Sequence, residues 1–246
     1  MSDQSAKSVS AVVREADTEE ILDSKESAEE AAETDTQKAE SPADVANDEA
    51  AESDLRADNL ANLKKVGTVH FVAVIAALTL FGAANTWALT SGIALALVVA
   101  VAAAYIAGTV LSGIIHEYGH YSGAVLSGAP HKVLKKPARY FFMFNFDMKA
   151  GSTRQALWMS WGGVLGSWLL VAALFLLLPM DGWATAALIA TVLGNAVNAS
   201  VFEVPIILKT RKSGEFEKEL YGRLESPGLV KMPGIVAGLL AFALLT

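Results

Sequence analysis

Long apolar runs dominate the chain from Val66 to its end, and they constrain the fold more than any other feature of the sequence. The runs fall at residues 66–89, 93–122, 156–178, 184–208 and 229–246. A helix needs about 20 apolar residues to cross the hydrocarbon layer of a bilayer. The last run contains Lys231 and Pro233, so either a short span or a re-entrant piece is expected there. The sequence therefore predicts an all-α integral membrane protein, built as a polytopic helical bundle.

The first sixty residues have a different composition from the rest of the chain. They contain eighteen Asp or Glu, five Lys or Arg, and no Phe, Tyr or Trp, within a chain of formal net charge −7. Such a segment cannot bury enough apolar surface to offset the entropy of ordering it. Met1–Ser10 also lacks the basic start and apolar run of a signal peptide. We therefore expect a disordered acidic cytoplasmic tail at residues 1–60 and a membrane-embedded domain at residues 61–246.

Basic residues indicate how the spans are oriented, because short cytoplasmic loops retain Lys and Arg. Lys64 and Lys65 precede the first span, and segments 123–155 and 209–225 are rich in basic residues. The intervening loops, 85–92 and 179–183, contain no Lys or Arg. We expect an integral protein of a plasma membrane, the inner membrane of a bacterium, with its amino terminus in the cytoplasm.

Two segments at the inner face are not expected to cross the membrane. The stretch 140–148 is aromatic and is bounded by Pro137 and Gly151, which predicts a short β-hairpin. An interfacial aromatic belt with no role in substrate binding is the alternative. In 215–225, apolar residues recur at helical spacing among charged ones, which predicts an interfacial helix.

Ionisable residues within apolar spans are costly and mark candidate functional positions. The second run contains His116, Glu117 and His120, and the chain has no cysteine, so a metal would be held by His, Asp or Glu. Positions 116 and 120 share one face of a helix and can bind one metal ion. Glu117 is then free to accept a proton from a metal-bound water. The pattern predicts a zinc hydrolase with Glu117 as the general base, and a chance pairing of core histidines is the alternative.

Two carboxylates are candidates for a third metal ligand, Asp181 and Glu203. In the expected topology Asp181 lies at the outer surface, whereas Glu203 lies near the inner end of its span, level with the two histidines. Because a bilayer core is about 30 Å thick, only Glu203 is expected to reach the metal. The alternative is an interfacial acid that pairs with Lys209 or Arg211.

Pro205 lies two residues after Glu203 in the same apolar run. Proline has no N–H to bond the carbonyl of Val201, so it loosens the helical turn that carries Glu203. A loosened turn would allow the carboxylate of Glu203 to swing toward the metal.

The run IIHEYGH at 114–120, with Gly128 after it, an inner-face aromatic hairpin and the glycine-rich WGGVLG at 161–166, resembles the site-2 protease family of intramembrane metalloproteases. The resemblance covers about residues 93–212. It implies a three-helix core in which His116 and His120 bind zinc, Glu117 is the base, and a later helix supplies a carboxylate ligand. It also implies that the substrate is a single transmembrane segment of another protein. On this resemblance, we expect the hairpin to hold the substrate as an added strand.

The resemblance departs from the family pattern at one point, because the Asn-Pro-x-x-Asp-Gly motif that usually carries the third ligand is absent. Three functions remain open: a zinc-dependent intramembrane protease, a membrane-anchored peptidase of the HtpX type whose third ligand is a Glu, and a non-catalytic scaffold that binds regulators. We expect the first, with Zn²⁺ as cofactor, a membrane-protein substrate and the lipid bilayer as partners, and no nucleic acid.

Overall fold

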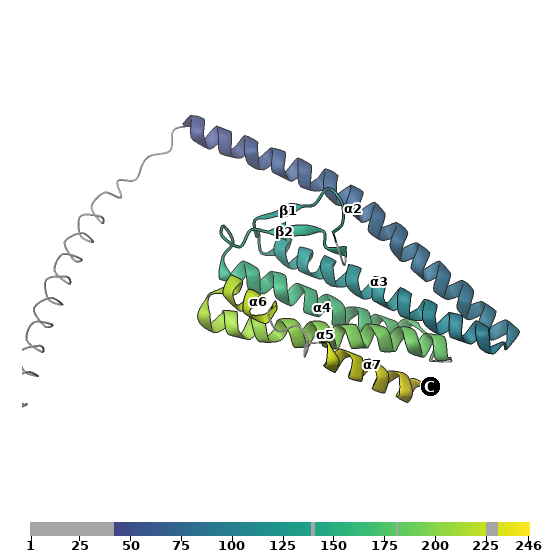
Figure 1. The fold of residues 1–246 in the computed structure, drawn as a ribbon. Helices are drawn as coiled ribbons and strands as arrows, with labels where there is room; N and C mark the ends of the chain where they lie inside the picture. Colours follow the sequence, from purple (N-terminus) through teal and green to yellow (C-terminus); the bar gives the residue numbers. More distant parts are fainter. Residues whose placement is uncertain (1–41, 139–140, 181, 225–230) are drawn as a thin grey trace, which may run out of the picture. The chain divides into compact units, whose positions relative to one another are not determined.

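The computed structural model describes residues 42–138, 141–180, 182–224 and 231–246 (Figure 1). The chain divides into two compact units, Met1–Ser53 and Asp54–Thr246. In the first unit the described part is residues 42–53, which begin helix α2. The predicted disorder of residues 1–41 lies outside the described residues.

Helix α2 spans Pro42–Ser91 and begins well before the predicted start of the first span. Residues 42–60, which we expected to be part of a disordered tail, are therefore helical. The stretch between Pro42 and Val66 is rich in Ala, Glu, Asp and Leu and contains no Gly or further Pro. Since Ala, Leu and Glu favour helix and nothing interrupts the segment, the helix of the apolar run extends back into the polar sequence.

The other apolar runs also form helices: α3 (Ala94–Leu126), α4 (Thr153–Leu177), α5 (Trp183–Ser213) and α7 (Met232–Leu245). Residues 52–91 of α2, together with α3, α4 and α5, are long and apolar enough to cross a membrane. Helix α7 has 14 residues and is shorter than a span. The mostly helical architecture and the four span-length helices were thus predicted correctly.

Glycines bring α3 and α4 into backbone contact. A Cβ atom on Gly119 would lie 2.9 Å from the carbonyl carbon of Gly162, and a Cβ on Gly162 would lie 2.9 Å from that of Gly119. One turn further along α3, a Cβ on Gly123 would lie 2.9 Å from the Cα of Met159. No side chain fits at these positions, so the small residues allow the close approach of the two helices.

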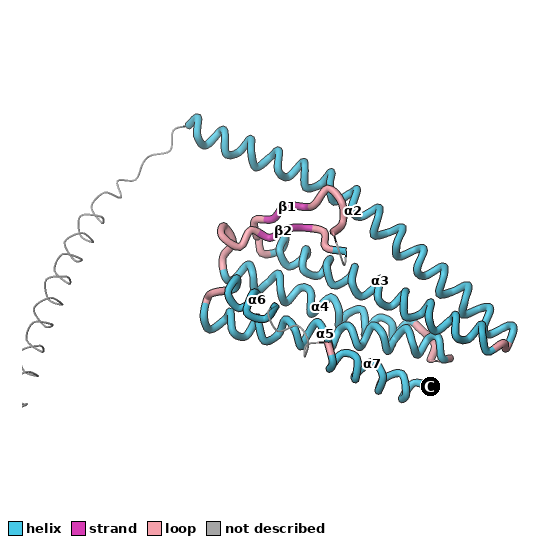
Figure 2. The backbone as a smooth tube through the Cα atoms, in the orientation of Figure 1, coloured by secondary structure: helices cyan, strands magenta, loops and turns pink. Residues whose placement is uncertain are grey.

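A two-stranded antiparallel sheet follows α3 (Figure 2). Strand β1 (His131–Val133) pairs with β2 (Phe144–Phe146), with Lys132 opposite Asn145. We predicted a hairpin at 140–148, but its first strand lies before Pro137, because proline cannot donate a ladder hydrogen bond and falls in the connecting loop. The predicted hairpin residue Tyr140 lies outside the described residues.

Two asparagines of α2 cover the outer edge of β1. Asn59 Oδ1 accepts a hydrogen bond from Val133 N at 2.8 Å, and Asn59 Nδ2 donates to His131 O at 3.1 Å. Asn62 Nδ2 donates to Val133 O at 3.2 Å. Among the described residues, no backbone hydrogen bond reaches the opposite edge of the sheet, which is formed by β2. The sheet therefore has one covered edge and one open edge.

Helix α6 (Phe216–Leu224) confirms the short helix predicted at 215–225. Gly214 adopts φ 76° after the last residue of α5, a conformation that glycine adopts without strain. Thr153 Oγ1 donates to Gly214 O at 2.9 Å and joins this turn to the start of α4. The ring of Phe216 packs edge-on against Phe146 of β2, with centroids 6.3 Å apart. These contacts hold α6 beside the sheet.

Candidate metal centre

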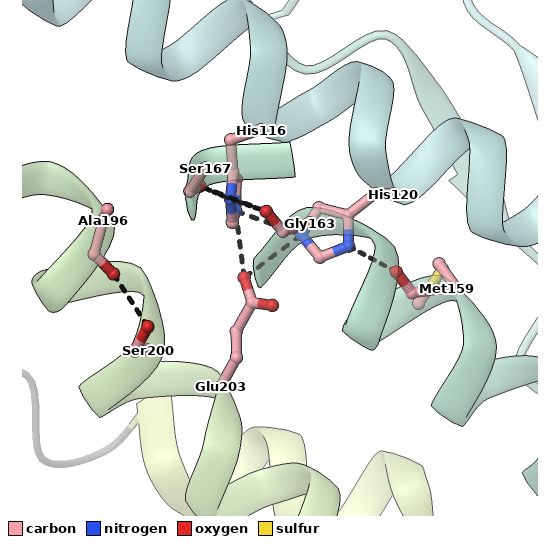
Figure 3. Close-up of polar contacts among 8 residues, drawn as sticks. All are labelled: His116, His120, Met159, Gly163, Ser167, Ala196, Ser200 and Glu203. Atoms are coloured by element: carbon pink, nitrogen blue, oxygen red, sulfur yellow. Dashed lines mark hydrogen bonds and ion pairs between the residues drawn. The ribbon is translucent and has the colours of Figure 1, made fainter. Parts of the chain in front are cut away.

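Helices α3 and α5 bring His116, His120 and Glu203 together (Figure 3). Oε1 of Glu203 lies 2.9 Å from His116 Nε2 and 3.1 Å from His120 Nε2, and the two Nε2 atoms are 3.1 Å apart. The three donor atoms therefore form a nearly equilateral triangle. Neighbouring ligand atoms around a tetrahedral zinc ion lie about 3.3 Å apart, as bond lengths of about 2.0–2.2 Å require. The three residues fit one metal ion with an open fourth position.

The remaining nitrogen of each imidazole faces an acceptor on α4. His120 Nδ1 lies 2.9 Å from Met159 O, and His116 Nδ1 lies 3.1 Å from Gly163 O and 3.0 Å from Ser167 Oγ. A backbone carbonyl can only accept a hydrogen bond, so each Nδ1 carries the proton and donates it. Metal-binding histidines typically donate their second ring nitrogen in this way.

This tautomer leaves both Nε2 atoms as lone-pair donors. In the neutral imidazoles the two lone pairs and the Glu203 carboxylate then converge on one point, with no hydrogen between them. Three electron-rich atoms about 3 Å apart repel one another unless a cation or a proton lies between them. The second oxygen of the carboxylate, Glu203 Oε2, is buried and has no hydrogen-bond partner among the described residues. The donor set is the one expected for a divalent transition metal.

Because Gly163 has no side chain, the imidazole of His120 can lie directly against α4. A Cβ atom at Gly163 would lie 2.5 Å from His120 Nε2 and 2.8 Å from Nδ1. The carbonyls of Met159 and Gly163, one helical turn apart, meet the two imidazoles, which are also one turn apart. The glycine-rich contact of α3 with α4 thus sets the orientation of both candidate ligands.

A hydrogen bond joins α4 to α5 about one helical turn before Glu203. Trp168 Nε1 of α4 donates to Ser200 Oγ at 2.9 Å. Ser200 Oγ in turn donates to Ala196 O of its own helix at 2.9 Å (Figure 3). Among the described residues, Glu203 does not form the alternative ion pair with Lys209 or Arg211. Lys209 Nζ lies 3.8 Å from Glu219 of α6 instead.

Glu117 lies at the same cavity as the three candidate ligands. Its side chain is buried, and Oε2 has no hydrogen-bond partner among the described residues. An unpartnered buried carboxylate oxygen is costly, so a group that donates to it is expected in the functional protein. A water bound beside the three-ligand cluster would fill that role.

The cavity has a volume of about 520 Å³ and is lined mainly by apolar side chains. Its apolar wall comes from three places: β2 and the residues beside it, the start of α4, and the facing residues of α5 and α6. These residues are Phe142, Phe144, Phe146, Met148, Met159, Phe202, Ile206, Phe216 and Leu220. A cavity of this size and lining accepts a large apolar group beside the metal centre.

Sequence reasoning did not identify two residues that the structure draws attention to, Ser167 at the centre and His70 elsewhere in the fold. Ser167 was not considered, because a serine in an apolar span is common and carries no periodic signal. The sequence did not single out His70 either, yet it is buried, and its ring packs edge-on against those of Tyr118 and Phe141, each 5.7 Å away between centroids. Asp181, the rejected alternative ligand, lies outside the described residues.

Comparisons of the chain with known protein families, with curated proteins and with solved structures found no match.

Proposed function

We propose that the chain is a zinc-dependent intramembrane protease that hydrolyses peptide bonds in or near transmembrane segments of other proteins. One observation supports the metal centre above the others: His116 Nε2, His120 Nε2 and Glu203 Oε1 converge within 3.1 Å while the Nδ1 atoms donate elsewhere. The buried carboxylate of Glu117 beside this cluster, whose Oε2 has no hydrogen-bond partner among the described residues, supports hydrolysis rather than a purely structural metal. Structural zinc sites are closed, whereas this one leaves a position for water.

Each residue of the centre has a separate role in the proposed reaction. Zinc, when bound, acts as a Lewis acid and makes a water acidic enough to be deprotonated near neutral pH. Glu117 would accept that proton, and the water oxygen would then form a bond to the peptide carbonyl carbon. As the carbon–nitrogen bond breaks, Glu117 returns the proton to the departing amine nitrogen. Ser167, Met159 and Gly163 keep both imidazoles oriented through their Nδ1 atoms.

The proposed substrate is an extended segment that enters from the bilayer. The open edge of β2 offers backbone groups to an added strand, and main-chain pairing tolerates varied side chains. Because Asn59 and Asn62 cover the other edge, a strand can add only on the side of β2. Phe144 and Phe146 of β2 line the cavity that contains the metal centre, so a strand paired there would lie beside it.

The four span-length helices fit an integral membrane protein. We place the amino terminus and the catalytic centre on the cytoplasmic side of a bacterial inner membrane, because Lys and Arg gather in the segments next to the His116 end of α3 and the Glu203 end of α5. The same ends are joined by the sheet and α6, which carry the cavity wall.

Cleavage of tagged single-span segments by purified protein in detergent or liposomes tests this function. Wild-type protein with zinc is expected to cleave a subset of them, and Glu117→Gln is expected to bind zinc but to lose at least about 100-fold in rate. Glu217→Gln, an exposed acid on α6, is the matched control and keeps wild-type activity. Activity of Glu117→Gln within a few-fold of wild type would exclude Glu117 as the base, and zinc binding without cleavage of any segment by wild type would favour the scaffold function.

A further inference from the structure

Pro205 leaves a gap in the hydrogen bonding of α5 at the turn that carries Glu203. Proline at position 205 has no N–H, so the carbonyl of Val201 lacks its partner within the helix. Glu203 lies between these two positions and is therefore in the turn that has lost a hydrogen bond. In a segment surrounded by lipid or protein, an unpaired carbonyl is costly and its turn is free to distort.

Arg223 of α6 supplies the missing hydrogen bond from outside the helix. Its Nη2 atom donates to Val201 O at 2.9 Å, and the contact is partly buried. A hydrogen bond from a guanidinium is charge-assisted and is stronger than the backbone N–H···O hydrogen bond that it replaces. The guanidinium is planar and always charged, so this donor is not lost by deprotonation.

The helix that provides Arg223 is itself held in place. Lys209 of α5 and Glu219 of α6 form an ion pair at 3.8 Å, and the ring of Phe216 packs on Phe146. Phe216 and Leu220 of α6 line the cavity that contains the metal centre. Helix α6 therefore contacts both the cavity and the turn of α5 from which Glu203 reaches the two histidines.

We infer that Arg223 is a positioning residue for Glu203: through the carbonyl of Val201 it fixes the proline-interrupted turn of α5 and thereby the third metal ligand. This inference rests on the proposed metal centre. A substitution of Arg223 acts on metal binding through Val201 and Glu203, although Arg223 itself touches no metal ligand. A purely structural role for α6 would lower stability without a specific effect on the metal.

The test uses full-length Arg223→Met, which keeps an apolar stem for packing but removes every donor. The matched control is Arg211→Met, which removes an exposed basic residue from the last turn of α5. Affinity is measured by competition with a chromophoric zinc chelator, and the coordination is followed by visible absorption of the cobalt-loaded protein. Loss of a direct hydrogen-bond partner of a ligand typically weakens metal binding about 10–100-fold, and Arg223 acts one step further out, so a loss at the lower end of that range, about 10-fold, applies here. We expect that loss, with a changed cobalt spectrum, in Arg223→Met and a less than about three-fold change in Arg211→Met.

A Pro205→Ala background makes the test specific. Alanine restores an N–H at position 205 that can bond Val201 O, so Arg223→Met is expected to weaken metal binding less than about three-fold there. An equal loss in both backgrounds would overturn the inference, as would wild-type affinity in Arg223→Met. A metal-binding chain with the expected pattern but no cleavage of membrane segments would leave Arg223 in this role and refute only the proposed protease activity.

Discussion

Replacing Gly163 with alanine places a methyl group against a candidate metal ligand. The added Cβ would lie 2.5 Å from His120 Nε2 and 2.8 Å from Nδ1, whereas comfortable contacts lie at about 3.5–4.0 Å. The imidazole of His120 must therefore move by about 1 Å or rotate away. Ligand distances in metal sites are held to within about 0.2 Å, so a shift of that size removes His120 from the coordination sphere.

The same substitution leaves the helix contact almost intact, because the obstructing atoms belong to a side chain that can move. We expect Gly163→Ala to fold, to keep most of its thermal stability and to bind zinc at least about 100-fold more weakly than wild type. Gly162→Ala is the instructive contrast. Its Cβ would lie 2.9 Å from the carbonyl carbon of Gly119, so the backbones of α3 and α4 must separate and the protein loses stability as well.

Zinc affinity from chelator competition and unfolding followed by circular dichroism, both in the same detergent, distinguish these two effects. Gly82→Ala on α2 is the control, because a Cβ atom there would meet nothing within 4 Å. A folded Gly163→Ala protein with zinc affinity within about three-fold of wild type would refute the assignment of His120 as a ligand.

Two further predictions concern residues that sequence reasoning did not identify. Ser167→Ala removes one of the two acceptors of His116 Nδ1 and is expected to weaken zinc binding by about 10-fold, since Gly163 O remains. Affinity equal to that of Ser122→Ala, a hydroxyl on α3 that bonds its own helix, would contradict this role. Asn59→Ala leaves Val133 N and His131 O without partners and is expected to lower the free energy of unfolding by about 1–3 kcal/mol in detergent titrations. A change no larger than in the exposed Asp58→Ala would show that Asn59 does not stabilise β1.

The sequence predicts the helices well because each apolar run carries its own signal. Length and hydropathy identify the four span-length helices, and the spacing of His116 and His120 within one of them indicates a shared face. The choice of Glu203 over Asp181 as the third ligand came from topology alone, and the structure brings Glu203 to both histidines. The position of Glu203 near the two histidines could be predicted because consecutive spans cross the membrane in opposite directions.

Short-range detail was harder to predict where the signal depends on tertiary contacts. The strand His131–Val133 is too short to show alternation. Its partner Asn59 lies in the segment expected to be a polar tail, and Asn62 lies just after that segment. The start of α2 at Pro42 was missed because composition cannot separate a solvated helix from a disordered acidic segment. Pro205 predicted that the carbonyl of Val201 lacks a hydrogen bond within α5. The group that donates to this carbonyl, Arg223, could not be predicted because it lies on a separate helix.

X-ray absorption at the zinc edge, with total zinc content, tests the metal centre most directly. Purified wild-type protein is expected to contain about one zinc per chain, bound by two imidazoles and two oxygens, one from Glu203 and one from water, at about 2.0–2.2 Å. Glu203→Gln is expected to weaken zinc binding sharply, and a variant with alanine at both His116 and His120 is expected to contain none. Full zinc occupancy in that double variant, or a wild-type protein that binds no zinc, would contradict the account.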